Sequence, residues 1–257
     1  MKVVLLAGGL GTRLREETEF RPKPMVPVGG KPILWHIMKN FSWYAFNDFV
    51  VCAGYRGEVI RQFFRDFETM NSDFTVRIGS KTEIKSHGKL EESGWVITVA
   101  DTGQDTMTGG RLFKVKDYVG DETFICTYGD GLADVNILDL LKFHKSHGKI
   151  ATVTTVRPIS RFGVLDLNED GTVERFREKP QADGWINAGF FVFEPAIFNY
   201  LNQDSVLETE PLSTLAAEGQ LVAFKHEGFW QPMDTFRELT ILNKMWDTNS
   251  APWKVWK

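Results

Sequence analysis

The sequence predicts an α/β fold, and three observations lead to this prediction. Apolar runs such as Val3–Ala7 and Phe49–Ala53 contain no alternating polar residues, which is typical of strands buried on both faces of a parallel sheet. Lys31–Phe46 and Glu58–Phe67 follow them with apolar residues at helical spacing. After Val156 the chain becomes richer in short strands. We therefore expect a Rossmann-like open sheet, mixed but mostly parallel, with helices on both faces and a smaller β-rich portion.

The first half of the chain continues this rhythm with one interruption. Gly79–Gly94 is polar, mixed in charge and without a clear period, so it is interpreted as an inserted loop or hairpin. A solvated loop is favoured over an arm that reaches another subunit. The other elements expected here are strands at Trp95–Ala100, Thr123–Thr127 and Ile150–Val156, a turn-rich loop at Asp101–Gly110, and helices at Arg111–Tyr118 and Ile137–His147.

The second half adds strands and helices without any repeat or low-complexity linker. The expected strands are Gly163–Leu167, Val173–Phe176, Ile186–Phe193 and Leu221–Lys225, and the expected helices are Pro195–Asn202, Pro211–Glu218 and Thr235–Trp246. We therefore expect one domain over residues 1–257, with a first part at roughly 1–135 and a second part at roughly 136–257. Exposed tryptophans are costly, so Trp253 and Trp256 in the tail are expected to pack on the domain or on a partner.

Composition narrows the functional classes. The chain has 257 residues and a formal net charge of -4, which argues against broad binding of nucleic acid. Cys52 and Cys126 lie in strand-like runs, so we expect buried free thiols in a reducing cytoplasm. No apolar run approaches the length that spans a membrane.

A glycine-rich turn after the first strand is the strongest local signal. Gly8, Gly9 and Gly11 let backbone N–H groups approach an anion, and Arg13 and Lys23 add positive charge, so the loop is predicted to bind phosphates. Leu14 stands where a dinucleotide-binding motif needs its third glycine, and no Gly-Lys-Ser/Thr follows as in a Walker loop. Three prolines also prevent a long helix directly downstream: Pro22, Pro24 and Pro27.

Other polar residues admit two interpretations from their positions alone. Asp130 follows a buried strand and is either a ligand-binding carboxylate or part of an Asp-Gly turn. Asp234 is most simply a helix N-cap, and Lys179 could be one half of a surface charge pair. Asn187 enters an apolar strand, where a polar side chain needs a ligand or a partner.

Two histidines, His144 and His147, are three residues apart on a predicted helix and could share a metal ion. No third ligand is evident, so a solvated helix face is the favoured interpretation.

The segment Leu-Ala-Gly-Gly-Leu-Gly-Thr-Arg-Leu at 6–14, followed by Pro-Lys-Pro-Met at 22–25, resembles the signature of the nucleoside-diphosphate-sugar pyrophosphorylases. Further similar segments extend the resemblance across nearly the whole chain: Tyr128–Gly131, Phe162-Gly163, Glu178–Pro180, Asn187–Gly189 and Trp230–Thr235. Met107–Arg111 and Phe229–Thr235 are similar to the branch that uses CTP and glucose 1-phosphate. The glutamine-proline segment usual near the base in the uridylyl and thymidylyl branches is absent there.

This resemblance implies that CTP and α-D-glucose 1-phosphate give CDP-glucose and diphosphate, a product used for dideoxysugars of bacterial surface polysaccharide. It implies Arg13, Lys23 and Lys179 as catalytic residues and Asp130 and Asp234 as ligands of Mg²⁺. The implied nucleotide-binding residues are Leu6, Ala7, Gly8, Gly9, Gly11, Thr12, Arg13, Lys23, Thr108, Gly109, Arg111, Tyr128 and Gly129. The implied sugar-phosphate-binding residues, in the β-rich portion, are Gly163, Glu178, Lys179, Asn187 and Gly189.

The chemistry is consistent with these residues. A phosphate oxygen of the sugar phosphate attacks the α-phosphorus in line, and diphosphate leaves. That oxygen is already ionised at neutral pH, so the reaction needs positioning and charge neutralisation rather than a general base. Arg111 is a candidate for base choice, because an arginine fork can donate to O2 and N3 of cytosine but meets N3–H in uracil and thymine. The alternative is a surface arginine at a helix start.

Three alternatives to this function are considered. UTP- or dTTP-dependent enzymes are alternatives within the family. A non-catalytic sensor on the same fold should have lost a cation or a metal carboxylate, whereas all are present here. An NAD-dependent oxidoreductase does not fit the glycine-rich loop, which lacks the third glycine of the dinucleotide-binding motif.

The resemblance also implies a homohexamer with active sites near subunit boundaries.

Overall fold

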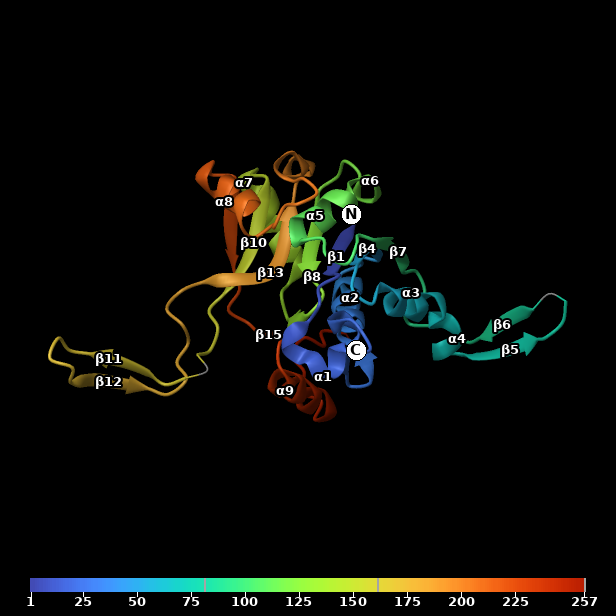
Figure 1. Cartoon of the computed structure of the whole chain (residues 1–257), viewed down its shortest axis with the longest axis horizontal. Coiled ribbons are helices and arrows are strands. Elements are labelled where there is room, and N and C mark those ends of the chain that lie inside the picture. Colours follow the sequence, from blue (N-terminus) through green and yellow to red (C-terminus); the bar gives the residue numbers. More distant parts are fainter. Residues whose placement is uncertain (81, 161, 257) are drawn as a thin grey trace.

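A seven-stranded sheet forms the centre of the computed structural model, which describes residues 1–80, 82–160 and 162–256 (Figure 1). β13 pairs antiparallel with β8 and β10, and the other neighbouring strands pair in parallel, so the sheet is mixed and mostly parallel as predicted. In their order across the sheet the strands are β14 (Leu221–Lys225), β10 (Ala151–Val156), β13 (Ile186–Phe193), β8 (Phe124–Tyr128), β1 (Val3–Ala7), β4 (Asp48–Ala53) and β7 (Val96–Asp101).

Helices cover both faces of this sheet because its central strands present apolar side chains to both sides. In β1, Val3 and Leu5 belong to one core and Val4 and Leu6 to the other. The first core includes residues of α2 (Ile33–Trp43), α3 (Gly57–Arg65), α7 (Ile137–His147) and α9 (Phe236–Asp247). The second core includes residues of α5 (Thr108–Lys114), α6 (Lys116–Val119), η3 (Pro195–Tyr200) and α8 (Glu210–Ala217).

The predicted elements are present, but several differ in their ends, in their continuity or in the type of helix. The helix expected over Lys31–Phe46 is confined to α2, and Ala45 adopts a left-handed conformation (φ 66°) just beyond its end. The segment predicted as Glu58–Phe67 divides into α3 and α4 (Phe67–Asn71). The helix expected to begin at Arg111 begins earlier, at Thr108. The segment Pro195–Asn202 forms a 3₁₀ helix rather than an α-helix.

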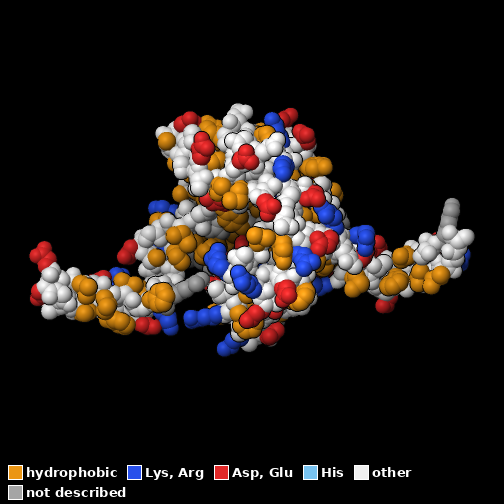
Figure 2. Space-filling view, viewed as in Figure 1, with side chains coloured by type: hydrophobic (Ala, Val, Ile, Leu, Met, Phe, Trp, Pro, Cys, Tyr) orange, Lys and Arg blue, Asp and Glu red, His pale blue; other side chains and the backbone are white. Residues whose placement is uncertain are grey.

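Two β-hairpins project from opposite sides of the molecule (Figure 1). The first consists of β5 (Asp73–Arg77) and β6 (Glu83–His87), which agrees with the hairpin interpretation of the insertion, although the hairpin starts before Gly79. Lys81, within that segment, lies outside the described residues. The second consists of β11 (Val164–Leu167) and β12 (Val173–Arg177), and we call it the β11–β12 arm. Figure 2 shows hydrophobic side chains along both projections.

The tail packs on its own domain, which is one of the two arrangements expected from the sequence. Trp253 is fully buried and Trp256 nearly so, both in the first core. Their rings meet the edges of Trp35 and His36 at the start of α2. Lys257 lies outside the described residues.

Cys52 and Cys126 are both buried free thiols, as predicted. Within the residues that the structure describes, no helix combines the length and apolar character needed to cross a membrane.

Candidate active site

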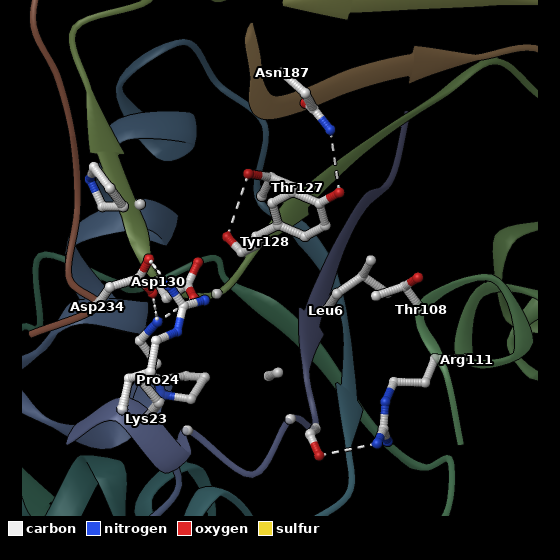
Figure 3. A pocket seen from close by; sticks show the side chains of 18 of the residues that line it. Leu6, Lys23, Pro24, Thr108, Arg111, Thr127, Tyr128, Asp130, Asn187 and Asp234 are labelled. Atoms are coloured by element: carbon white, nitrogen blue, oxygen red, sulfur yellow. Dashed lines mark hydrogen bonds and ion pairs between the residues drawn. The ribbon is translucent and has the colours of Figure 1, made fainter. Parts of the chain in front are cut away.

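A cavity of about 540 Å³ opens where β1 and β8 end. The two strands are parallel neighbours, so Ala7 and Tyr128 bring their loops to the same edge of the sheet, where ligands bind in open α/β folds. Figure 3 shows side chains from the β1 loop, α5, β8, β13 and the segment before α9 converging on this space. The volume suits a nucleotide-sized ligand.

The glycine-rich loop after β1 forms one wall of this cavity. Gly11 adopts a left-handed conformation (φ 62°), and a Cβ there would lie 2.9 Å from the Thr18 side chain. The loop continues through short pieces rather than one long helix, as the prolines predict: η1 (Thr12–Leu14), α1 (Arg15–Thr18), η2 (Lys23–Met25), β2 (Pro27–Val28) and β3 (Lys31–Pro32). This path brings Arg13 and Lys23 to the cavity wall.

Lys23 lies between the two predicted metal-binding carboxylates (Figure 3). Its ammonium donates to Asp130 Oδ2 at 2.6 Å and also to Asp234 Oδ1, while Arg13 Nη1 donates to Asp234 Oδ2 at 2.8 Å. Burial alone would lower the pKa of Lys23, but the two aspartates outweigh it and hold the pKa above its usual value. The ammonium is therefore a fixed positive charge at neutral pH.

Each aspartate is held by its own backbone surroundings. Asp130 lies in the turn between β8 and β9 (Gly131–Ala133), and its carbonyl accepts from Met233 N–H at 2.9 Å. Met233 follows β15 (Trp230–Pro232), which pairs with β9. Asp234 is not the N-cap of α9, because Thr235 has that role in a capping box with Glu238.

This donor set fits a divalent cation. Two carboxylates approach one buried ammonium, and magnesium sites commonly use one or two carboxylates completed by water and substrate phosphates. Within the described ranges no group of three or more His, Cys, Asp or Glu side chains could hold a metal ion, so water and substrate would have to complete the coordination of a cation at Asp130 and Asp234.

The opposite wall is the start of α5. Arg111 is buried rather than on the surface, and its two Nη atoms donate to the carbonyls of Gly8, Gly103 and Gln104 at 2.8–3.0 Å and to Thr102 Oγ1. The guanidinium therefore joins the glycine-rich loop to the segment after β7. A Cβ on Gly8 would lie 2.1 Å from Arg111 Nη1, so only glycine permits this approach.

The sugar-phosphate candidates are divided between two places. Asn187 at the start of β13 lines the cavity. Gly189 does not line it but lies against Tyr128, because a Cβ there would meet Cδ2 of that ring at 2.3 Å. The other candidates, Gly163, Glu178 and Lys179, lie at the β11–β12 arm, away from the residues that line the cavity (Figure 1).

All predicted nucleotide-binding positions except Gly109 line the cavity. Gly109 does not, because it faces Ser205, whose Cβ would lie 2.7 Å from an added Cβ. The predicted positions that do line the cavity are Leu6, Ala7, Gly8, Gly9, Gly11, Thr12, Arg13, Lys23, Thr108, Arg111, Tyr128 and Gly129, together with Asp130, Asp234 and Asn187. Their individual roles stay predictions.

Several lining residues were not predicted. Trp230 belongs to a segment that the resemblance had already singled out, and its indole N–H donates to the Ala188 carbonyl at 2.8 Å. Five others also lie in segments quoted for the resemblance: Pro24, Met107, Gly131, Ala188 and Pro232. Thr106, Thr127 and Phe190 flank such segments and carry no motif of their own.

His144 corrects a further expectation. It is buried, not on a solvated helix face, and its ring nitrogens contact Thr152 Oγ1 at 2.8 Å and Glu194 Oε1 at 3.0 Å. His147 Nε2 contacts the same threonine at 2.8 Å. The pair therefore belongs to a partly buried hydrogen-bond network rather than to a metal site.

Known proteins resemble this chain over its whole length. The model of the nucleotidyl transferase family matches residues 2–244. Glucose-1-phosphate cytidylyltransferases of Salmonella typhi and Salmonella typhimurium are each 50% identical over 260 residues, covering 100% of both chains.

Solved structures show the same fold. The apo UDP-glucose pyrophosphorylase structure aligns with a TM-score of 0.70 at 15% identity, over 96% of this chain and 98% of the other. HddC from Yersinia pseudotuberculosis aligns with a TM-score of 0.69 at 22% identity, over 95% and 99%.

Proposed function

The chain belongs to the nucleotidyl transferase family, and we propose that it transfers the cytidylyl group of CTP to α-D-glucose 1-phosphate, forming CDP-glucose and diphosphate. The observation that carries this proposal is the group of Arg13, Lys23, Asp130 and Asp234 at the glycine-rich end of the cavity. The full-length identity with relatives of that name supports the choice of substrates.

Charge neutralisation is the main work of the protein in this reaction. The sugar phosphate and the triphosphate are both anions that must approach closely, and the transition state spreads negative charge over the phosphoryl oxygens. Arg13 and Lys23 lie on the cavity wall where the triphosphate would meet the backbone N–H groups of the glycine-rich loop. The attacking phosphate needs no base, so positioning supplies the rest.

Nucleotidyl transferases generally use a divalent metal, and we propose that Asp130 and Asp234 hold Mg²⁺ here. When bound, the metal would neutralise phosphate oxygens and orient them for the displacement. Lys23 and Arg13 would then direct their charge to the phosphates instead of to the two carboxylates.

We propose that Arg111 determines the preference for cytosine. It lines the cavity beside Thr108, on the side opposite Lys23 (Figure 3). Its Nη atoms hold three backbone carbonyls, so its fork sets the distance between the two segments that would enclose the base. These carbonyls and Thr102 Oγ1 take up the four Nη hydrogens, so Arg111 would act by shaping the space for the base rather than by donating to O2 and N3 of cytosine as the sequence suggested.

We also propose that the chain assembles with itself, as a hexamer by family resemblance. Glu178 and Lys179 lie on the β11–β12 arm, outside the cavity of their own chain, and the ammonium of Lys179 pairs with its neighbour Glu178 at 3.4 Å. The arm exposes Phe162, Leu165 and Phe176, which a partner would cover. In such an assembly the arm would bring the sugar-phosphate residues to a neighbouring cavity, with residues 1–257 acting as one domain.

The buried thiols support a reducing compartment, and we propose the cytoplasm, with CDP-glucose entering dideoxysugar synthesis for surface polysaccharide. The deciding experiment is diphosphate release by the purified protein with glucose 1-phosphate and each of CTP, UTP and dTTP in Mg²⁺. The fastest release with CTP is expected. Faster turnover with UTP or dTTP would contradict the cytidylyl assignment, and CTP binding without diphosphate release would indicate a sensor.

A further inference from the structure

Glu208 lies outside the cavity yet contacts two of its walls. Its carboxylate accepts a hydrogen bond from Thr108 Oγ1 at 2.6 Å and another from the Tyr128 phenol. Thr108 begins α5 and Tyr128 ends β8, and both line the cavity. We propose that Glu208 is a positioning residue for nucleotidyl transfer, which fixes Tyr128 and, through it, Asn187 for glucose 1-phosphate. This inference rests on the function proposed above.

The loop that carries Glu208 is held tightly against the start of α5. Gly110 N–H donates to the Ser205 carbonyl at 2.9 Å, and Leu207 N–H donates to Thr108 Oγ1 at 3.0 Å. A Cβ on Gly110 would lie 2.2 Å from the carbonyl oxygen of Gln203, so the loop backbone needs glycine at that position. Leu207 is fully buried in the second core. Glu208, the next residue, is therefore fixed in place although its side chain reaches solvent.

The hydrogen bonds at Glu208 have one consistent direction. Because Leu207 N–H must donate to Thr108 Oγ1, the threonine gives its own proton to Glu208. Burial and the Glu208 carboxylate raise the pKa of the Tyr128 phenol, which therefore stays protonated and donates. The two carboxylate oxygens of Glu208 each accept one of these hydrogen bonds. A glutamine amide has only one oxygen, so it could not accept both in the same way.

The same direction continues to the sugar side of the cavity. With its proton given to Glu208, the Tyr128 oxygen accepts from Asn187 Nδ2 at 3.3 Å. The other end of that amide, Oδ1, accepts from Gly189 N–H at 2.7 Å. The Asn187 amide therefore has a single orientation, and removing Glu208 would free the phenol that maintains it. The expected consequence is weaker binding of glucose 1-phosphate, with CTP binding affected less.

The test compares steady-state kinetics of the wild type with Glu208→Ala, Glu208→Gln, Tyr128→Phe and the double variant Glu208→Ala/Tyr128→Phe. We expect the KM for glucose 1-phosphate to rise about tenfold in Glu208→Ala and less in Glu208→Gln, the size expected for losing a hydrogen bond to a charged group. The KM for CTP should change by less than about threefold, because Thr108 keeps its hydrogen bond from Leu207 N–H when the carboxylate is removed. The double variant should be no worse than the poorer single variant, because both changes break one chain of bonds.

Glu210→Ala is the matched control, since it removes an exposed carboxylate two residues further on, at the start of α8, and should leave both KM values unchanged. A folded Glu208→Ala enzyme with the wild-type KM for glucose 1-phosphate would overturn the inference, as would additive effects in the double variant. If Glu208→Ala does not fold, Glu208→Gln is nearly isosteric and decides the question by the same KM. Failure of the wild type to release diphosphate from CTP would instead refute the proposed function.

Discussion

Trp253 donates its indole N–H to Nδ1 of His36 at 3.4 Å, although the two residues are 217 positions apart. The other ring nitrogen, Nε2, contacts the Val28 carbonyl at 2.8 Å and must donate to it. The imidazole is therefore neutral with one tautomer, and burial lowers its pKa from 6.5 to about 4. This contact joins the tail, α2 and the loop after β1.

His36 should make the protein less stable in acid. Its pKa is depressed in the folded state, so the unfolded chain binds the proton more readily, and the stability lost accumulates as the pH falls from 6.5 through about 4. The full loss is about 3 kcal/mol on the scale of 1.36 kcal/mol per pKa unit. Urea unfolding at several pH values measures it. In His36→Phe the slope of the unfolding free energy against pH should fall by the equivalent of about one bound proton. His87→Gln, on the exposed hairpin, should leave that slope unchanged. An unchanged slope in His36→Phe would contradict the argument.

Replacing Lys23 should remove catalysis without unfolding the protein. Lys23→Met takes the ammonium from Asp130 and Asp234 and from the triphosphate, so kcat/KM for CTP should fall by about 10²-fold or more. Lys39→Met is the matched control, because Lys39 is equally buried but binds Glu91 and Glu92. That control should lose stability and keep its specific activity. Equal activity losses in the two variants would argue against a role of Lys23 in charge neutralisation.

Arg111→Lys should change base preference. Lysine keeps the charge but cannot hold the carbonyls of Gly8, Gly103 and Gln104 together. We expect CTP turnover to fall about tenfold or more, the loss expected when hydrogen bonds to a charged group are removed. The ratio of CTP to UTP turnover should also fall. Arg237→Lys, at an exposed position of α9, is the control. A ratio equal to that of the wild type would exclude Arg111 from base selection.

Subunit mixing tests whether the β11–β12 arm serves another chain. Lys179→Met lacks the arm cation and Asp130→Asn lacks a carboxylate of the cavity, so each variant alone should be inactive. If arms are exchanged, co-refolded mixtures should regain roughly a quarter of wild-type activity, since random assortment gives that share of sites two intact parts. Mixtures without any recovery would place the arm at its own cavity. Light scattering on the wild type should show particles larger than the 29.3 kDa monomer.

The sequence predicts best those elements whose signals lie within the segment itself. β1, α7, β13 and β14 have the predicted bounds because their apolar pattern and flanking turns lie within the segment itself. The sequence did not separate a hairpin from a loop at the first insertion, because apolar residues such as Phe74 and Val76 are half exposed and belong to neither core.

The site residues that the sequence predicts are likewise those whose signals lie within one segment. Gly11, Arg13 and Lys23 were recognisable because one short loop holds them all. Arg111 was not recognised as buried, because its partners come from segments after β1 and β7 that only the folded sheet brings together. Glu208 has no motif, and its importance depends on two side chains 80 and 100 residues away.

The contact between His36 and Trp253 also has a consequence for synthesis. A ribosome makes α2 more than 200 residues before the tryptophan that closes over it. The nascent first half therefore exposes the apolar surface around Trp35 and Phe41 until the tail has emerged, which is the condition under which chaperones bind growing chains. This core is therefore completed only after Trp253 and Trp256 have left the ribosome, however early its first strands can pair.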